Sequence, residues 1–82
     1  MDMNEATAKA LTAERAISGL TVRQLATRSG IPLSSLMRIL SAEREIKVNQ
    51  VASLAAALGV YPHEVVEYAE RLIERCDRGE EA

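Results

Sequence analysis

Three glycines divide most of the chain into segments that have the length and apolar spacing of helices. Gly19, Gly30 and Gly59 each follow such a segment, where a helix commonly ends with a residue of positive φ. The chain has two tyrosines and no phenylalanine or tryptophan, so Leu, Ile, Val, Ala and Met must build its core. Four glycines and two prolines are too few for the turns of an all-β domain. We therefore expect an all-α fold.

Helix start signals divide the chain further. Thr21 and Gln24 have the spacing of a capping box, which places a helix start directly after Thr21. Pro32 and Pro62 supply the fixed φ that suits the beginning of a helix. Together with the apolar spacing, these signals predict helices over residues 3–18, 22–28, 33–40, 48–58 and 62–76.

The length and the rare residue types limit the class of protein. A chain of 82 residues forms one domain, which we place at residues 1–76, followed by a disordered acidic tail at 77–82. One cysteine and one histidine exclude a disulfide framework and a four-ligand zinc site, so we expect no metal and no cofactor. No apolar run reaches the roughly 20 residues of a membrane span. The first residues also lack a signal-peptide pattern, so we expect a cytoplasmic protein with no membrane contact.

The net charge of −2 hides an uneven distribution of charge along the chain. Residues 9–47 contain seven basic and three acidic residues, a net of +4. Residues 62–82 contain three basic and seven acidic residues, a net of −4. We expect any phosphate-binding surface in the middle of the chain, with the C-terminal segment facing away from it or serving another purpose.

The middle of the chain has the pattern of a helix-turn-helix. Leu25 and Ala26 are expected to face inward on the first of two short helices, and the small Ala26 side chain lets the second helix cross closely. Gly30 permits the sharp turn between the helices. Leu36 and Ile39 then anchor the second helix to the core. This arrangement holds the second helix where it can enter the major groove of DNA.

Residues 20–65 resemble the phage repressor and Cro-like helix-turn-helix family, also called the XRE family. The resemblance rests on the order and spacing of Leu25-Ala26, Gly30-Ile31, Leu36, Arg38-Ile39 and Leu54-Ala55-x-x-Leu58-Gly59-Val60. It implies a compact, five-helix, lambda-repressor-like domain with a central helix-turn-helix. It also implies a repressor, of phage or prophage origin, that binds double-stranded DNA as a homodimer at a palindromic operator.

The resemblance further assigns roles to individual positions. The base-reading positions are Leu33, Ser34, Met37 and Arg38. The positions that contact the DNA backbone are Thr21, Arg23, Gln24, Arg44, Lys47 and Asn49. Arg38 is the strongest candidate, because a guanidinium can bond O6 and N7 of guanine together. Pro32 replaces a serine or threonine cap of many members, so we expect that phosphate contact to be absent. Arg15 and Arg28 are expected only to be solvated.

The helix at 62–76 carries an apolar stripe that is longer than a four-helix core can cover. We expect Leu72, Ile73 and Cys76 to project beyond the core and to pair with a second copy. The predicted dimer residues are Val66, Ala69, Leu72, Ile73 and Cys76. Two-fold symmetry would place the recognition helices about 34 Å apart, one turn of DNA. The alternative is that this helix folds back as ordinary core.

No residue pattern indicates an enzyme, so we expect no catalytic residue. Ser34 and Ser35 lack a glycine elbow, His63 lies far from them in sequence, and no glycine-rich loop is present to cradle a nucleotide. The expected function is sequence-specific regulation of transcription. The alternative is a module that binds a protein partner, for example an antitoxin, with weak or no specific DNA binding. In that alternative, the apolar Leu33 and Met37, the acidic last helix and the net negative charge serve to bind the protein partner.

Overall fold

The computed structural model describes residues 1–79, which contain five helices and no strand. The helices are α1 (Met3–Ser18), α2 (Val22–Ser29), α3 (Leu33–Leu40), α4 (Val48–Leu58) and α5 (Pro62–Asp77). The all-α, five-helix prediction is confirmed, and α2 and α5 each extend one residue beyond their predicted ends. The predicted tail is thus wrong at its first residue, because Asp77 belongs to α5. Residues 80–82 of that predicted tail lie outside the described residues.

Local hydrogen bonds explain why the helices begin and end where the sequence predicts. Thr21 Oγ1 accepts a hydrogen bond from the Gln24 amide at 3.0 Å, and Gln24 Oε1 accepts one from the Thr21 amide at 2.9 Å. This is the predicted capping box at the start of α2. The three glycines expected at helix ends have φ between +75° and +78°. Their left-handed conformation turns the chain away from α1, α2 and α4.

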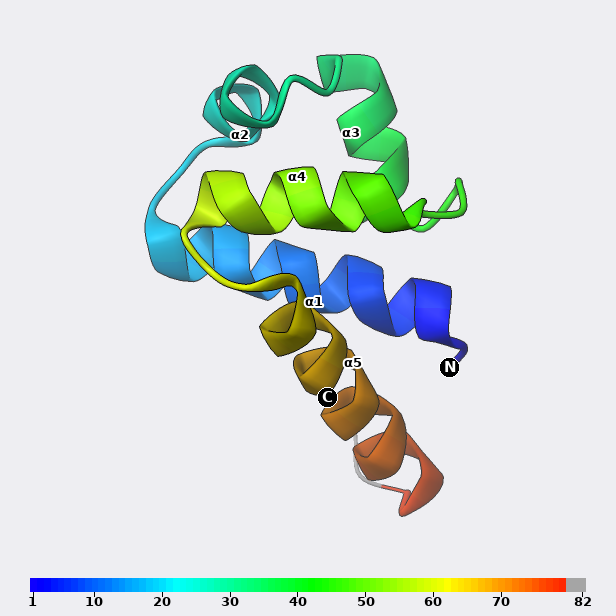
Figure 1. Cartoon of the computed structure of the whole chain (residues 1–82). Coiled ribbons are helices and arrows are strands. Elements are labelled where there is room, and N and C mark those ends of the chain that lie inside the picture. Colours follow the sequence, from blue (N-terminus) through cyan, green and yellow to red (C-terminus); the bar gives the residue numbers. More distant parts are fainter. Residues whose placement is uncertain (80–82) are drawn as a thin grey trace.

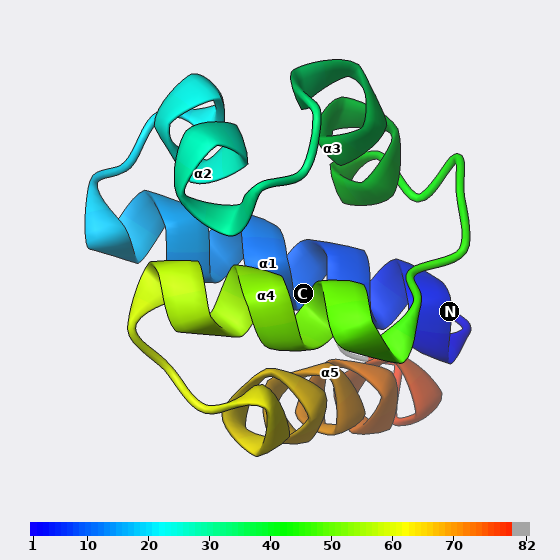
Figure 2. The ribbon, with the colours of Figure 1, turned by 45° about the horizontal axis from the view of Figure 1, so that its top comes forward.

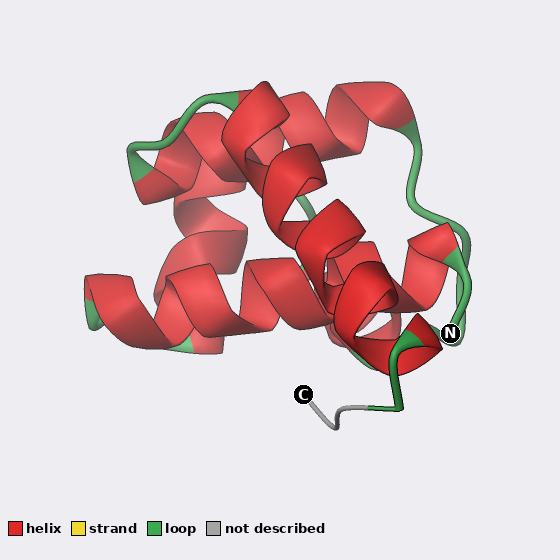
Figure 3. Cartoon of the chain, turned by 90° about the horizontal axis from the view of Figure 1, so that it is seen from below, coloured by secondary structure: helices red, strands yellow, loops and turns green. Residues whose placement is uncertain are grey.

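The helices pack in three layers around one core. Helices α1 and α4 lie side by side in the middle, with α2 and α3 on one side of them and α5 on the other (Figures 1 and 2). The most extensive contact between any two helices joins α1 and α5. The view from below shows α5 in front of the other helices (Figure 3). The acidic helix therefore lies on the side of the molecule away from α2 and α3.

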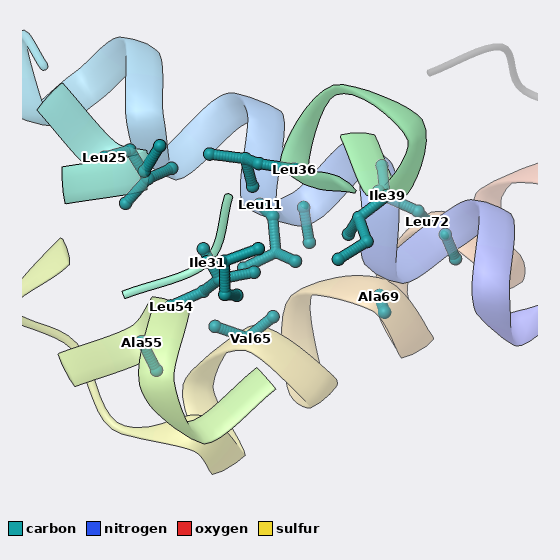
Figure 4. Packing of buried hydrophobic residues seen from close by; sticks show 13 residues of the cluster. Leu11, Leu25, Ile31, Leu36, Ile39, Leu54, Ala55, Val65, Ala69 and Leu72 are labelled. Carbon is teal, nitrogen blue, oxygen red and sulfur yellow. The ribbon is translucent and has the colours of Figure 1, made fainter. Parts of the chain in front are cut away.

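The core draws buried side chains from all five helices (Figure 4). Its largest fully buried side chains are Leu11, Leu25, Leu36, Ile39, Leu54 and Val65. Small side chains complete it, because Ala6 and Ala10 of α1 and Ala69 of α5 are fully buried as well. Each helix is thus held in the fold by the side chains that it buries in the core. Because Leu36 and Ile39 of α3 point into the core, the opposite face of α3 points outward.

Candidate nucleic-acid interface

The turn between α2 and α3 has the geometry of a helix-turn-helix. Leu25 and Ala26 of α2 are buried, and so are Leu36 and Ile39 of α3, as predicted. Gly30 has a φ of +75°, and its amide donates to the Ala26 carbonyl at 3.0 Å. This bond ends α2, and the chain then enters α3 at a steep angle to α2 (Figure 1). The orientation of α3 relative to α2 is consequently fixed.

The outward face of α3 carries three of the four predicted base-reading side chains. Ser34, Met37 and Arg38 are exposed, Met37 to 58%. No hydrogen bond or ion pair within residues 1–79 engages the Arg38 guanidinium. Leu33 differs from these three, because it is half-buried and packs against the core. The α3 surface thus offers one unengaged cation beside a hydroxyl and a flexible apolar side chain.

The start of α2 provides the first group of predicted backbone contacts. The capping box uses one oxygen each of Thr21 and Gln24, while the Thr21 hydroxyl hydrogen and the Gln24 amide group remain available to donate. The first backbone amides of a helix, here those of Val22 and Arg23, have no acceptor within it. A helix start with nearby cations attracts phosphate. The structure therefore brings Thr21, Arg23 and Gln24 together at one exposed helix start.

Arg28 belongs to the same surface, although the sequence predicts only a solvated residue at this position. It lines a shallow hollow along α2 together with Thr21, Arg23, Gln24 and Thr27. Side chains four residues apart project from the same side of a helix, which pairs Arg23 with Thr27 and Gln24 with Arg28. The spacing of Arg28 from Gln24 was the signal that could have identified it.

The loop between α3 and α4 provides the second group. Arg44 donates from Nη1 to Ser35 Oγ of α3 at 3.4 Å, so its side chain lies back against that helix. Lys47 directly precedes α4, and Asn49 lies in the first turn of α4. Lys47 and Asn49 are exposed, as is Arg44. The loop and the start of α4 thus continue the basic surface from the far end of α3.

The structure corrects the expected position of two dimer residues. Leu72 is 6% exposed and Ala69 is fully buried, and both belong to the core of the chain itself. The expectation that Leu72 projects beyond the core is wrong, because α5 packs along α1 and buries that face. Ile73 is half-buried against the core, whereas Cys76 is exposed. The role of Val66, Ile73 and Cys76 in a dimer stays a prediction.

Val66 takes part in a groove that no local sequence pattern predicts. It is 38% exposed and lines an open, mainly apolar groove of about 290 Å³ with Met3, Val48 and Val51. These residues come from α5, α1 and α4, so only the folded chain brings them together. Val48 is 87% exposed and is the most accessible large apolar side chain in residues 1–79.

Arg15 is not simply solvated, contrary to expectation. Its Nη1 donates to the Leu20 carbonyl at 2.6 Å, and the side chain is half-buried. This bond links the end of α1 to the segment that leads into α2. Arg15 is therefore a structural residue, and the basic surface that remains is formed by α2, α3 and the following loop.

The described residues show neither a metal-ligand cluster nor a membrane-spanning element. No group of three or more His, Cys, Asp or Glu side chains in residues 1–79 is arranged to hold a metal ion. No helix in that range is long and apolar enough to cross a membrane.

Comparisons with known proteins agree with this geometry. The chain matches the family described as a helix-turn-helix domain over residues 8–69. Two crystal structures of the clp gene regulator ClgR from Corynebacterium glutamicum are similar to it. In one, the identity is 30% and the TM-score 0.81, covering 85% of this chain and 91% of that chain. In the other, the identity is 26% and the TM-score 0.91, covering 96% of this chain and 84% of that chain. No curated protein matches the chain in sequence.

Proposed function

Because this chain belongs to the helix-turn-helix domain family of DNA-binding transcription regulators, we propose that it is a repressor that recognises a specific operator through α3. The observation that carries this proposal is the outward face of α3. Its inward residues Leu36 and Ile39 are fully buried, while Arg38 is exposed and unengaged. A helix anchored in this way can enter the major groove with no change in its own packing.

In this proposal α3 reads the bases. Arg38 donates two hydrogen bonds to O6 and N7 of a guanine, a contact that discriminates against other bases by about 1–3 kcal/mol. Ser34 donates to or accepts from a neighbouring base edge. Met37 packs on a thymine methyl group, and the exposed part of Leu33 contributes to the same apolar contact.

The DNA backbone is held on both sides of α3. Thr21, Arg23 and Gln24 bind one phosphate stretch at the start of α2. Arg44, Lys47 and Asn49 bind another beyond the end of α3. Each cation that meets a phosphate releases counterions, so binding weakens as the salt concentration rises. The acidic α5 lies on the other side of α1 and α4, which keeps its charges away from the phosphates (Figure 1).

We propose further that the chain acts as a homodimer on an approximately palindromic operator and excludes the polymerase by occupying it. Support comes from the exposed apolar side chains around Val66, because Met3 and Val48 are left open to solvent in the single chain. A second copy that covers them would remove apolar surface from water. Similarity to a protein described as a clp gene regulator supports a role in gene regulation.

The test is a selection of random duplex DNA by the purified chain, followed by binding measurements on the enriched site across a salt series. We expect an inverted repeat, bound at least about a thousandfold more tightly than random DNA. Arg38→Ala should remove about tenfold or more of the specific affinity and relax the preference at one base pair. Arg75→Ala, which removes an exposed cation from α5, is the matched control and should bind like the wild type.

The second candidate function is binding to a protein partner, as an antitoxin does. The 58% exposure of Met37 and the open groove around Val48 favour it, because exposed apolar patches are common at protein interfaces. The same selection separates the two functions. An absence of any enriched motif, with weak binding that salt abolishes, would reject the repressor and favour a protein partner.

A further inference from the structure

Asn4, in the first turn of α1, makes two hydrogen bonds to a segment about 40 residues later in the chain. Its Nδ2 donates to the Arg44 carbonyl at 3.2 Å. Its Oδ1 accepts from the Ile46 amide at 2.8 Å. One side-chain amide thereby satisfies a backbone acceptor and a backbone donor that lie two residues apart in the loop between α3 and α4.

This loop has few other attachments to the body of the protein. Its beginning follows α3 directly, where the Ala42 amide bonds the Ile39 carbonyl at 3.1 Å and the Glu43 amide bonds the Arg38 carbonyl at 2.9 Å. The Ile46 side chain packs against the core near its end. Between these two points, the Asn4 amide ties the loop backbone to α1, and the Arg44 side chain donates to Ser35 Oγ of α3 at 3.4 Å. Figures 1 and 2 show the loop reaching the side of the molecule where α1 begins.

The two hydrogen bonds of Asn4, which we call the clamp, hold a stretch of backbone that carries two of the proposed phosphate contacts. The Arg44 carbonyl is itself one of the bonded groups, and Lys47 follows directly after the bonded amide of Ile46. An ordered loop presents these cations without a further loss of conformational entropy when DNA binds. A loop without the Asn4 bonds must instead become ordered when DNA binds, and this entropic cost lowers the affinity for DNA.

We infer that Asn4 is a positioning residue for DNA binding, which acts by holding the loop of Arg44 and Lys47 ready for phosphate. The inference rests on the proposed function. It extends the DNA-binding machinery to the first turn of α1, a helix that contributes none of the proposed DNA contacts. No local sequence pattern indicates this role, because the partners of Asn4 are 40 and 42 residues away in the sequence.

The test compares two variants of the same helix turn in the full chain. Asn4→Ala removes both bonds to the loop. Asp2→Ala is the matched control, because Asp2 caps α1 by accepting from the Glu5 amide at 2.8 Å, and no hydrogen bond within residues 1–79 joins Asp2 to the loop. We expect Asn4→Ala to bind the selected operator about fivefold to tenfold more weakly than the wild type. Asp2→Ala should lower stability and leave operator binding within about twofold of the wild type.

A double-mutant cycle distinguishes positioning from general destabilisation. In the background of Arg44→Ala, Asn4→Ala should cost clearly less affinity than it does in the wild type, because part of its effect passes through Arg44. Equal losses in both backgrounds would overturn the inference for Arg44. Equal losses for Asn4→Ala and Asp2→Ala would overturn it altogether.

Hydrogen exchange at the Ile46 amide tests the clamp without DNA. This amide should exchange at least about tenfold faster in Asn4→Ala than in Asp2→Ala. An unchanged rate would show that the clamp does not hold the loop, and would overturn the inference even if the operator is bound. If the wild type selects no operator while the exchange behaves as expected, the proposed function fails and the role in DNA binding fails with it, although the clamp itself stands.

Discussion

Replacing Leu72 with alanine measures whether α5 belongs to the core of a single chain. The side chain is 6% exposed and part of the core cluster. The substitution removes three buried carbon atoms, worth about 0.8 kcal/mol each. A cavity term raises the expected loss to about 3 kcal/mol. A domain of this size has a free energy of unfolding of about 4–12 kcal/mol, so the loss is a large fraction of the total.

Urea unfolding followed by circular dichroism, at protein concentrations of about 1 µM and about 100 µM, gives the decisive comparison. If Leu72 packs only within its own chain, the loss in free energy of unfolding is the same at both concentrations. This loss corresponds to a fall in Tm of about 12–24 °C. Ile17→Ala is the control, because Ile17 is 75% exposed and should change stability by less than about 0.5 kcal/mol. A loss below about 1 kcal/mol at the lower concentration, or one that grows with concentration, would refute the assignment of Leu72 to the core.

Three further substitutions test local features. Ala42→Gly should raise the free energy of unfolding by about 0.5–1 kcal/mol, because Ala42 has a φ of +62° that glycine adopts without strain; an unchanged urea midpoint would contradict this. Gly30→Ala should lower it by about 1 kcal/mol in the same assay. An added Cβ at Gly30 meets no atom within 4 Å, so backbone strain is the only expected cost. A much larger loss would contradict this explanation. Lys47→Ala should weaken binding to all DNA sequences alike and reduce the salt slope by about 1, whereas a selective loss on the operator would exclude a phosphate contact.

The helix boundaries were predictable because they depend on neighbouring residues. The capping box of Thr21 and Gln24 and the glycines after α1, α2 and α4 act within one turn of each helix end. The alternation between buried and exposed positions in α3 follows from helical periodicity alone. These features place the helix-turn-helix and the exposed Arg38 without knowledge of the tertiary structure.

Most of the errors and omissions concern features that no local sequence pattern specifies. The burial of Leu72 depends on how α5 lies along α1, which no local pattern specifies. The bonds of Asn4 join residues 40 and 42 positions apart, and the bond of Arg15 to the Leu20 carbonyl depends on how the chain leaves α1. The left-handed conformation of Ala42 was equally hidden, since alanine carries no preference for it.

The division of α3 between two faces also bears on how such a protein can change over evolution. Leu36 and Ile39 are fully buried, whereas Ser34, Met37 and Arg38 touch solvent and make no contribution to the core cluster. Exposed substitutions usually alter stability by less than about 0.5 kcal/mol. Mutations at these three positions are thus nearly free of folding constraint. Under the proposed function, a lineage can acquire a new target preference while it inherits an unchanged scaffold.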